Sequence, residues 1–246
     1  MASIELRSVS VRCGEDRRTV LDSIDLDISY GSISLLLGAN GSGKTVLLRT
    51  ILGLFPTIGG TITLDGVVLK RPFTRLHRMS GVCFQNSNVQ IFGETVREDI
   101  EIGRAPITSD DEPVLDAFGI GELLDLSPSE LSGGQLRRVA LAGAFLRKPR
   151  FLFLDEPFLE LDYPHIVRTV DQIDSARRRG VAVVITSHET RDIWEVLDRV
   201  TILERGRVVF CGSPADAISE ISPSIGLRPF SDDTPHRSGN GVYDSR

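Results

Sequence analysis

The sequence predicts an α/β fold interrupted by a helical insert, and three observations lead to this prediction. A glycine-rich loop at residues 38–45 follows a short apolar run, 33–37, and precedes a helical pattern. Further strand-length apolar runs alternate with amphipathic helical stretches in the second half of the chain. Between these parts, residues 86–149 have almost no strand character. An α/β core with helices inserted into it accounts for all three observations.

Strands dominate the first third of the chain. Apolar and polar residues alternate over 4–11 and again over 24–28, which predicts two antiparallel strands. Residues 59–66 are expected to form a turn and a short strand closed by Asp-Gly, and residues 81–84 a buried core strand.

Helices are expected in the insert, and the alternation of strands and helices resumes after it. Within the insert, start signals predict helices over 95–101, 109–118 and 132–147. The later elements are expected to be strands at 151–154, 181–186, 200–203 and 207–210 and helices at 163–179, 190–197 and 214–221. Residues 229–246 are poor in apolar side chains, so we expect one folded domain over 1–228 followed by a disordered tail.

Composition narrows the classes of function. A chain of 246 residues with 41% hydrophobic and 25% charged residues can form a full globular core. No apolar run approaches the roughly 20 residues of a membrane span, and no secretory signal is visible. Three widely spaced cysteines predict neither a disulfide framework nor a metal site, and they fit a reducing cytosol. The net charge of −6 argues against nucleic acid as the main partner.

The glycine-rich loop has the composition of a phosphate-binding loop. Glycines let the backbone wrap around an anion, and the first amides of the following helix lack carbonyl partners. Lys44 is expected to reach the β- and γ-phosphates of a nucleotide, and the Thr45 hydroxyl to bind Mg²⁺. The alternative is a glycine-rich turn that happens to hold a lysine. The expected nucleotide-binding residues are Gly38, Ala39, Asn40, Gly41, Ser42, Gly43, Lys44, Thr45 and Val46.

A second motif ends the apolar run 151–154 with Asp155 and Glu156. Open α/β sheets bind ligands at the carboxyl ends of their strands. Beside a phosphate loop, Asp155 is expected to orient Mg²⁺ from behind its direct ligands, and Glu156 to polarise the attacking water. An ordinary strand end with solvated acids is the alternative interpretation.

A third motif consists of Leu131, Ser132, Gly133, Gly134 and Gln135. It opens the helix expected over the following residues, so the serine hydroxyl is expected to cap that helix. The glycine amides would then offer a second anion site. Taken alone, the motif is equally consistent with a capped helix start that carries glycines in its turn.

Together these motifs resemble the ATP-binding-cassette family. Their order is phosphate loop, Gln85, the signature at 131–135, the acidic strand end at 155–156, and His188 after an apolar strand. The resemblance covers nearly the whole folded part of the chain. It implies a P-loop NTPase core of the RecA-like type, an antiparallel β subdomain and a helical insert subdomain at about 86–149. ATP and Mg²⁺ are the implied cofactors.

The family resemblance also assigns roles within the catalytic site. Glu156, Gln85 and His188 would be catalytic, with Gln85 contacting Mg²⁺ and the attacking water and His188 touching the γ-phosphate. All three are intact, so an ATP-hydrolysing site is expected. Cys13 stands where the family places an aromatic residue that stacks on adenine, and such a stack is worth about 1–3 kcal/mol. Val46 replaces a hydroxyl that many relatives carry, which removes one α-phosphate contact.

Other implied roles concern pairing of two subunits. In the family, the signature of one subunit closes on ATP held by the phosphate loop of the other. Ser132 and Gly134 would contact the partner's γ-phosphate, and Asp162 would lie at the dimer seam. The partner would be a second ATPase subunit, identical or paralogous. Residues 157–162 are bulkier and more acidic than the usual small-residue version, which leaves the coupling across the dimer open.

Residues 84–100 resemble the ATPases of energy-coupling-factor transporters, a branch that takes up cobalt, nickel and vitamins. The segment shares the Phe-Gln-Asn start and the later Thr-Val and Glu-Asp pairs, whereas Ser87 and Asn88 depart from the pattern. The resemblance implies a peripheral ATPase on the cytoplasmic face of the membrane. An integral-membrane scaffold, and with it a substrate-binding membrane subunit, would dock in a groove beside this segment.

Two alternatives remain for the function, and a third is disfavoured. Within the family, the chain could serve another importer or exporter. A different class comprises non-transport ATPases acting on DNA or ribosomes, which usually carry a coiled-coil insertion or two cassettes. A regulatory module without turnover is disfavoured because Glu156 is intact.

Overall fold

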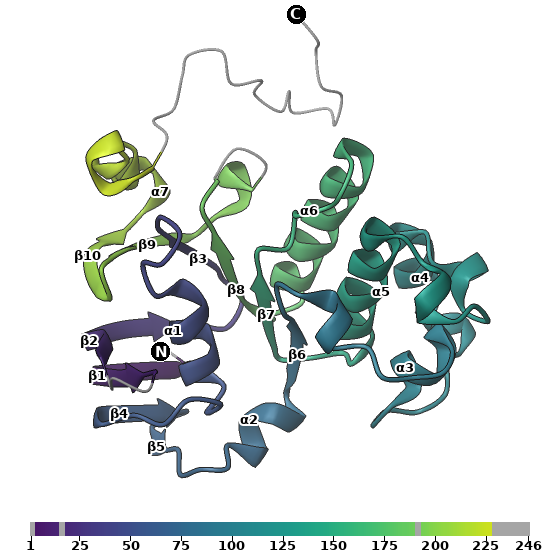
Figure 1. Ribbon diagram of the computed structural model, residues 1–246, viewed down its shortest axis with the longest axis horizontal. Helices are drawn as coiled ribbons and strands as arrows, with labels where there is room; N and C mark the ends of the chain where they lie inside the picture. The colour runs from purple at the N-terminus through teal and green to yellow at the C-terminus, as the bar shows by residue number, and fades with distance from the viewer. Residues whose placement is uncertain (1–2, 15–17, 190–192, 228–246) are drawn as a thin grey trace, which may run out of the picture.

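The computed structural model describes residues 3–14, 18–189 and 193–227, which form two sheets and a helical region (Figure 1). The smaller sheet is antiparallel, with the strand order β2-β1-β4-β5. Its strands are β1 (Ile4–Cys13), β2 (Arg18–Ile28), β4 (Gly59–Leu64) and β5 (Val67–Val68). The two predicted N-terminal strands are confirmed, but β2 begins at Arg18 rather than at residue 24.

The larger sheet has six strands in the order β10-β9-β3-β8-β7-β6. Neighbours from β9 to β6 are parallel, whereas β10 pairs with β9 in the antiparallel direction. The strands are β3 (Ile33–Leu37), β6 (Ser80–Cys83), β7 (Phe151–Asp155), β8 (Ala182–Ser187), β9 (Arg199–Glu204) and β10 (Arg207–Gly212). The predicted α/β core is confirmed, and the carboxyl ends of β3, β7 and β8 lie next to one another.

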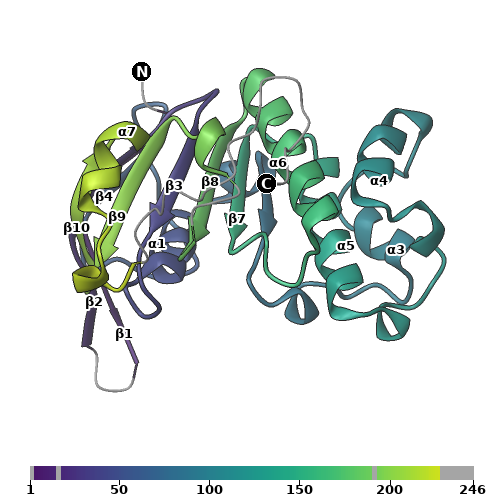
Figure 2. The same cartoon turned by 90° about the horizontal axis from the view of Figure 1, so that it is seen from above.

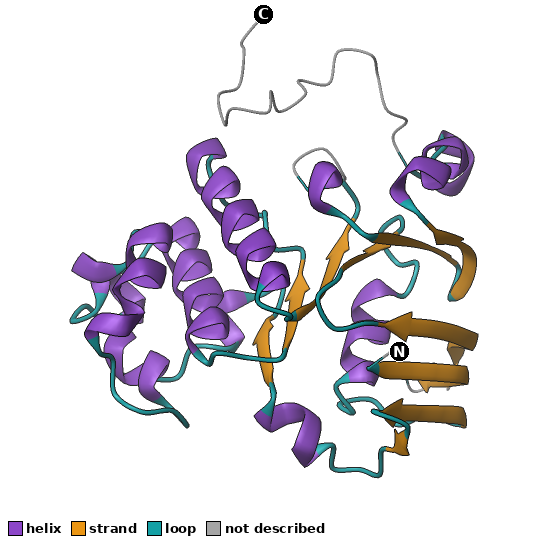
Figure 3. Cartoon of the chain, turned by 180° about the vertical axis from the view of Figure 1, so that it is seen from behind, coloured by secondary structure: helices purple, strands orange, loops and turns teal. Residues whose placement is uncertain are grey.

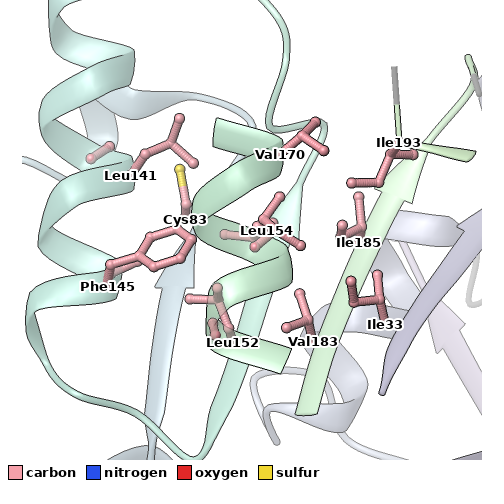
Figure 4. Packing of buried hydrophobic residues seen from close by; sticks show 14 of the residues in the cluster. Ile33, Cys83, Leu141, Phe145, Leu152, Leu154, Val170, Val183, Ile185 and Ile193 are labelled. Carbon is pink, nitrogen blue, oxygen red and sulfur yellow. The ribbon is translucent and has the colours of Figure 1, made fainter. Parts of the chain in front are cut away.

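Both faces of the larger sheet are covered, which explains why its strands are continuous apolar runs. In β7, Leu152 and Leu154 face one hydrophobic cluster while Phe151 and Phe153 face the other. On the first face lie α5 (Gly133–Leu146) and α6 (Tyr163–Arg178), which contribute side chains such as Phe145 (Figure 4). On the second face lies α1 (Lys44–Ile51), between this sheet and the antiparallel one.

The helical insert lies at one end of the molecule, as Figures 2 and 3 show. It contains α3 (Val96–Glu101), α4 (Glu112–Phe118) and α5, which confirms the three predicted helices apart from their first residues. Short 3₁₀ turns connect them at Ser87–Val89, Ser109–Asp111, Gly121–Leu123 and Pro128–Glu130. The insert is therefore attached to the core through β6 and β7, the strands that carry the predicted catalytic ends.

Three helices differ from prediction. The helix α2 (Thr74–Arg78) was not predicted because it is only five residues long. In the region expected to be helical at 190–197, the described residues form only a 3₁₀ turn, Trp194–Val196, and residues 190–192 lie outside the described ranges. The last predicted helix is α7 (Pro214–Ala217), followed by the 3₁₀ turns Ile218–Glu220 and Pro223–Ile225. The expected disordered tail at 229–246 also lies outside the described residues.

The contact between β6 and α5 leads to a stability prediction. A Cβ on Gly81 would lie 2.1 Å from the Ala144 carbonyl oxygen, whereas a Cβ on Gly143 would meet nothing within 4 Å. We expect Gly81→Ala to lower the free energy of unfolding by about 1–3 kcal/mol through overpacking. Gly143→Ala, the control within α5, should raise it by up to about 1 kcal/mol because alanine favours the helix. Urea denaturation measures both, and equal effects would contradict the close packing of β6 on α5.

Candidate nucleotide and catalytic site

The glycine-rich loop joins β3 to α1, and its shape depends on glycine at two positions. Gly43 precedes α1 with a φ of 110°, a conformation that residues with a side chain rarely adopt. A Cβ on Gly38 would lie 2.4 Å from Ser42 Oγ and 2.5 Å from the Leu203 carbonyl oxygen. The backbone therefore closes tightly just before α1, where the first helical amides have no carbonyl partner.

Lys44 begins α1, and its ammonium group lies inside this loop. Its Nζ donates to the carbonyls of Gly38 (2.7 Å) and Ala39 (3.3 Å) and lies 3.6 Å from Glu156 Oε1. Only 6% of the side chain is exposed, and this burial lowers the pKa of Lys44, while the Glu156 carboxylate opposes the shift. Loop carbonyls and a carboxylate thus hold the charge that is predicted to bind phosphates.

Asp155 is the last residue of β7 and is fully buried. Its Oδ1 accepts hydrogen bonds from the hydroxyls of Thr45 (3.1 Å) and Thr186. Its Oδ2 is also buried and has no hydrogen-bond partner among the described residues. Because an unpaired buried carboxylate oxygen is costly, this atom indicates that a cation belongs close to Asp155 and Thr45.

Glu156 directly follows β7, and its carboxylate lies between two predicted site residues. One oxygen is the partner of Lys44, and the other, Oε2, lies 3.0 Å from His188 Nδ1. Its amide donates to Thr186 Oγ1 (3.1 Å), which fixes the backbone in a turn with a φ of 49°. Glu156 and His188 line a cleft of about 170 Å³, which is large enough for water. The structure thus brings the carboxylate predicted to be the base, a histidine and the glycine-rich loop together.

The remaining residues predicted for this site lie at its edge. Gln85 follows β6, its side chain is exposed, and its carbonyl accepts a hydrogen bond from Arg137 (3.4 Å). Val46 is half-buried in α1, and Cys13 is half-buried at the end of β1, where both pack against the same hydrophobic cluster. Cys13 is paired across the sheet with Arg18.

The signature residues form a separate unit at the start of α5. The Gln135 amide donates to Ser132 Oγ (3.3 Å), and the Ser132 amide donates to Gln135 Oε1 (2.8 Å). This reciprocal pair confirms the predicted serine cap. Helices α1 and α5 lie on opposite faces of the larger sheet (Figure 2).

Asp162, predicted at the dimer seam, caps α6 in the described chain. Its Oδ1 accepts a hydrogen bond from the His165 amide (3.1 Å) and also contacts His165 Nδ1. These hydrogen bonds lower the pKa of Asp162. The carboxylate is exposed, so the cap leaves it accessible to a second subunit.

Arg137 is a buried residue of this region that sequence reasoning missed. Its side chain is the largest among those fully buried, and it reaches from α5 to the ends of β6 and β7. The guanidinium donates to the carbonyls of Phe84 (2.6 Å), Asp155 (2.7 Å), Pro157 (3.2 Å) and Glu156. One side chain of the insert therefore holds the backbone on both sides of the catalytic carboxylates. The sequence gives no clear signal, because Arg137 stands beside Arg138 and near Gln135 in the same helical turn.

Comparison with known proteins assigns the chain to a family. A family model described as ABC transporter matches residues 21–159, more than half of the 246-residue chain. The chain belongs to the ABC transporter family. It is thus an ABC ATPase, which binds and hydrolyses ATP, and the predicted P-loop NTPase fold is confirmed.

Relatives of this ABC ATPase are similar over most of its length. It is 34% identical over 214 residues to the energy-coupling factor transporter ATP-binding protein EcfA2 of Lactococcus lactis, which covers 82% of the chain and 74% of the relative. It is 32% identical over 226 residues to the cobalt import ATP-binding protein CbiO of Syntrophus aciditrophicus, with coverages of 88% and 80%. The solved structure of CbiO1 from Clostridium perfringens, part of the ABC transporter complex CbiONQ, superposes with a TM-score of 0.75 at 26% identity, covering 89% of this chain and 91% of that one. In the described part of this ABC ATPase, no helix is long and apolar enough to span a bilayer.

The Arg137 contacts lead to a prediction about the ABC ATPase. Arg137→Met keeps much of the side-chain volume but leaves several buried carbonyls without donors, each worth about 1–3 kcal/mol. We therefore expect a loss of at least about 2 kcal/mol in the free energy of unfolding, together with a lower kcat where the protein is folded. Arg97→Met, which removes an exposed ion pair to Asp125, is the control and should change stability by less than about 1 kcal/mol. Equal stability of the two variants in guanidinium denaturation would contradict this role for Arg137.

Proposed function

We propose that this ABC ATPase drives an importer of the energy-coupling-factor type for a metal ion or a vitamin. The names of the EcfA2 and CbiO relatives support this branch, as does the resemblance of residues 84–100 to it. The observation that carries the catalytic part is the Glu156 carboxylate, buried beside Lys44 and within 3.0 Å of His188.

In the proposed reaction, the γ-phosphate of ATP becomes the new counter-ion of Lys44. Glu156 is then free to accept a proton from the water that attacks the γ-phosphate, with His188 beside it to hold the phosphate oxygen. The buried surroundings exclude bulk water and strengthen these interactions. The side chains of Lys44, Glu156 and His188 all lie at the carboxyl end of β7.

Mg²⁺ fits the residues at this strand end. The unpaired Asp155 Oδ2 and the Thr45 hydroxyl are hard oxygen donors of the kind that Mg²⁺ prefers. Thr45 and Gln85 would hold the ion together with phosphate oxygens, and Asp155 would orient them from behind. When bound, the ion would neutralise charge on the phosphates. Among the described residues, no group of three His, Cys, Asp or Glu could bind a metal alone, which fits an ion held largely by the nucleotide.

A second ATPase subunit, identical or paralogous, is part of the proposal. The helices that follow the phosphate loop and the signature pack on opposite faces of the sheet, which supports a signature that reaches ATP from a partner. Ser132 and Gly134 would then contact the γ-phosphate in the partner, and Asp162 would lie at the seam. Closure on two ATP molecules, followed by reopening after hydrolysis, would supply the transport motion.

Membrane subunits would receive that motion at the helical insert. Four large apolar side chains of this region are exposed: Val89 (60%), Phe92 (79%), Ile102 (49%) and Leu126 (38%). Two hydrogen bonds fix the backbone that carries Phe92: the amides of Phe92 and Gly93 both donate to Asp99 Oδ1 (2.7 and 3.2 Å). A firm loop with an exposed aromatic residue suits the docking of a helix from an integral-membrane scaffold. A substrate-binding membrane subunit would complete the importer, with the ATPase peripheral on the cytoplasmic face.

Substitution of the proposed base is the direct test of the catalytic part. Glu156→Gln should slow single-turnover hydrolysis of ATP by about 10²-fold or more, because the amide cannot accept the proton. ATP binding, measured with a fluorescent analogue, should be retained or tightened, because the competing charge beside Lys44 is gone. Glu220→Gln is the exposed control and should match the parent. Wild-type turnover by Glu156→Gln would remove Glu156 from the role of base.

Substitution of the exposed aromatic residue tests the membrane partner. Phe92→Asp should reduce recovery of an integral-membrane scaffold with the tagged chain by about tenfold, because a central aromatic contact is lost. Its ATP affinity should stay within about twofold of the parent, since Phe92 lies outside the nucleotide site. Val209→Asp, at another exposed apolar position, on β10 (51% exposed against 79% for Phe92), serves as the control. Recovery of ribosomes or DNA in place of membrane subunits would overturn the transport assignment.

A further inference from the structure

We propose that a cavity between the helical insert and the core binds a small molecule with an apolar body and a hydroxyl group. The hydroxyl would donate to Asp111, a buried residue whose carboxylate has one oxygen without a hydrogen-bond partner among the described residues. The cavity lies at the amino end of β7, away from the nucleotide site at its carboxyl end. The inference therefore goes beyond the proposed function and does not depend on it.

The cavity has the size and the lining of a small-molecule site. Its volume is about 560 Å³, and such sites commonly measure about 300–1,000 Å³. Helices α4 and α5 of the insert form one side, and α6 with the amino ends of β7 and β8 forms the other. Val114, Phe145, Leu152 and Val181 give the cavity apolar walls, and Figure 4 shows Phe145 and Leu152. A molecule bound here would contact the insert and the core together.

Asp111 supplies a buried acceptor in the cavity wall. Only 1% of its side chain is exposed, and it lines the cavity together with Lys148. Its Oδ2 accepts hydrogen bonds from Arg104 Nη2 (2.6 Å) and from the Thr108 amide (3.1 Å). Its Oδ1 lies 3.8 Å from Lys148 Nζ, beyond hydrogen-bond distance, and has no other hydrogen-bond partner among the described residues. Because Lys148 itself lines the cavity, this free oxygen is the one on the cavity side.

The charges around Asp111 favour a neutral donor over a cation. Burial raises the pKa of Asp111, but hydrogen bonds from Arg104 and from a backbone amide outweigh this effect and hold the pKa below its ordinary value. The carboxyl group is therefore ionised at neutral pH and can only accept hydrogen bonds. Arg104 and Lys148 already balance its charge, so an ammonium group would be a third cation at one carboxylate. A hydroxyl supplies the missing donor and adds no charge.

Water alone fits this cavity less well than a ligand does. One water molecule could donate to Asp111 Oδ1, but it occupies only about 30 Å³ in the liquid. Further water molecules would lie against the apolar walls, where few polar partners are available. An apolar body removes those walls from water, which is favourable. A molecule with both an apolar body and one donor therefore satisfies the whole cavity.

The binding test compares four molecules of similar size on the full chain. They are 3-phenylpropan-1-ol, butylbenzene, 3-phenylpropanoate and 3-phenylpropan-1-amine, and methyl NMR follows the resonances of Val114 and Leu146, which line the cavity. We expect the alcohol to bind about three- to tenfold more tightly than butylbenzene, the factor for one net hydrogen bond. The alcohol should also bind more tightly than the carboxylate and the amine.

Two pairs of variants locate the site. Gln172→Trp places a large side chain in the cavity from α6 and should abolish binding of the alcohol, whereas Arg168→Trp, exposed one turn earlier on α6, should leave it unchanged. Lys148→Met removes one of the two cations beside Asp111 and should tighten binding of the amine by about two- to fivefold. Lys70→Met, which is exposed after β5, is the control and should bind the amine as the parent does.

Three results would overturn the proposal. If the alcohol causes no shifts at Val114 and Leu146 up to its solubility limit, water alone satisfies Asp111. Equal affinities for the alcohol and butylbenzene would exclude the hydrogen bond to Asp111. Tightest binding of the carboxylate or the amine would make the cavity a site for an ion. Because all four molecules are measured on the parent chain, none of these results depends on the folding of a variant.

Discussion

The buried ion pair between Lys44 and Glu156 is the interaction on which the rest of the site depends. Its charged atoms lie 3.6 Å apart, and the two side chains are only 6% and 8% exposed. Because a buried charge without a partner is costly, neither group can change its environment unless the other finds a new partner. A triphosphate offers Lys44 such a partner and thereby releases the carboxylate. In the proposed mechanism, nucleotide binding and activation of Glu156 as a base are therefore one event at the junction of α1 and β7.

Arg137 extends this constraint to the helical insert. It is fully buried on α5, and its guanidinium binds the carbonyls of Asp155 and Glu156 as well as that of Phe84. A buried guanidinium whose partners are mainly carbonyls is sensitive to small displacements, since each lost bond leaves a polar group unpaired. Because Arg137 binds these carbonyls, a displacement of α5 would also displace the backbone of Asp155 and Glu156 and the segment that leads to Gln85. Arg137 therefore couples the helical insert to the carboxyl end of β7.

Sequence patterns correctly predicted the elements whose formation depends mainly on residues close together in the chain. The apolar runs that became β3, β7 and β8 are buried on both faces, and the cap at Ser132 needs only residues within one helical turn. The early part of β2 could not be predicted because it follows an irregular register with β1 and includes Ser23 at a φ of 52°. The burial of Arg137 was equally hidden, because its partners are carbonyls 18 to 53 positions away, and a carbonyl has no sequence signature. A sequence motif carries no information about backbone partners that are distant along the chain.

Apart from Asp155 Oδ2, the chain pairs the main charged and hydroxyl groups of its predicted site with its own atoms. Lys44 binds the carbonyls of Gly38 and Ala39, and the Thr45 hydroxyl binds Asp155. The Glu156 carboxylate stands beside Lys44, where a phosphate is expected. Binding of ATP is then an exchange of anions rather than the filling of an open site. In the proposed dimer, the free energy for closure would come from the contacts of two subunits that hold one phosphate from both sides.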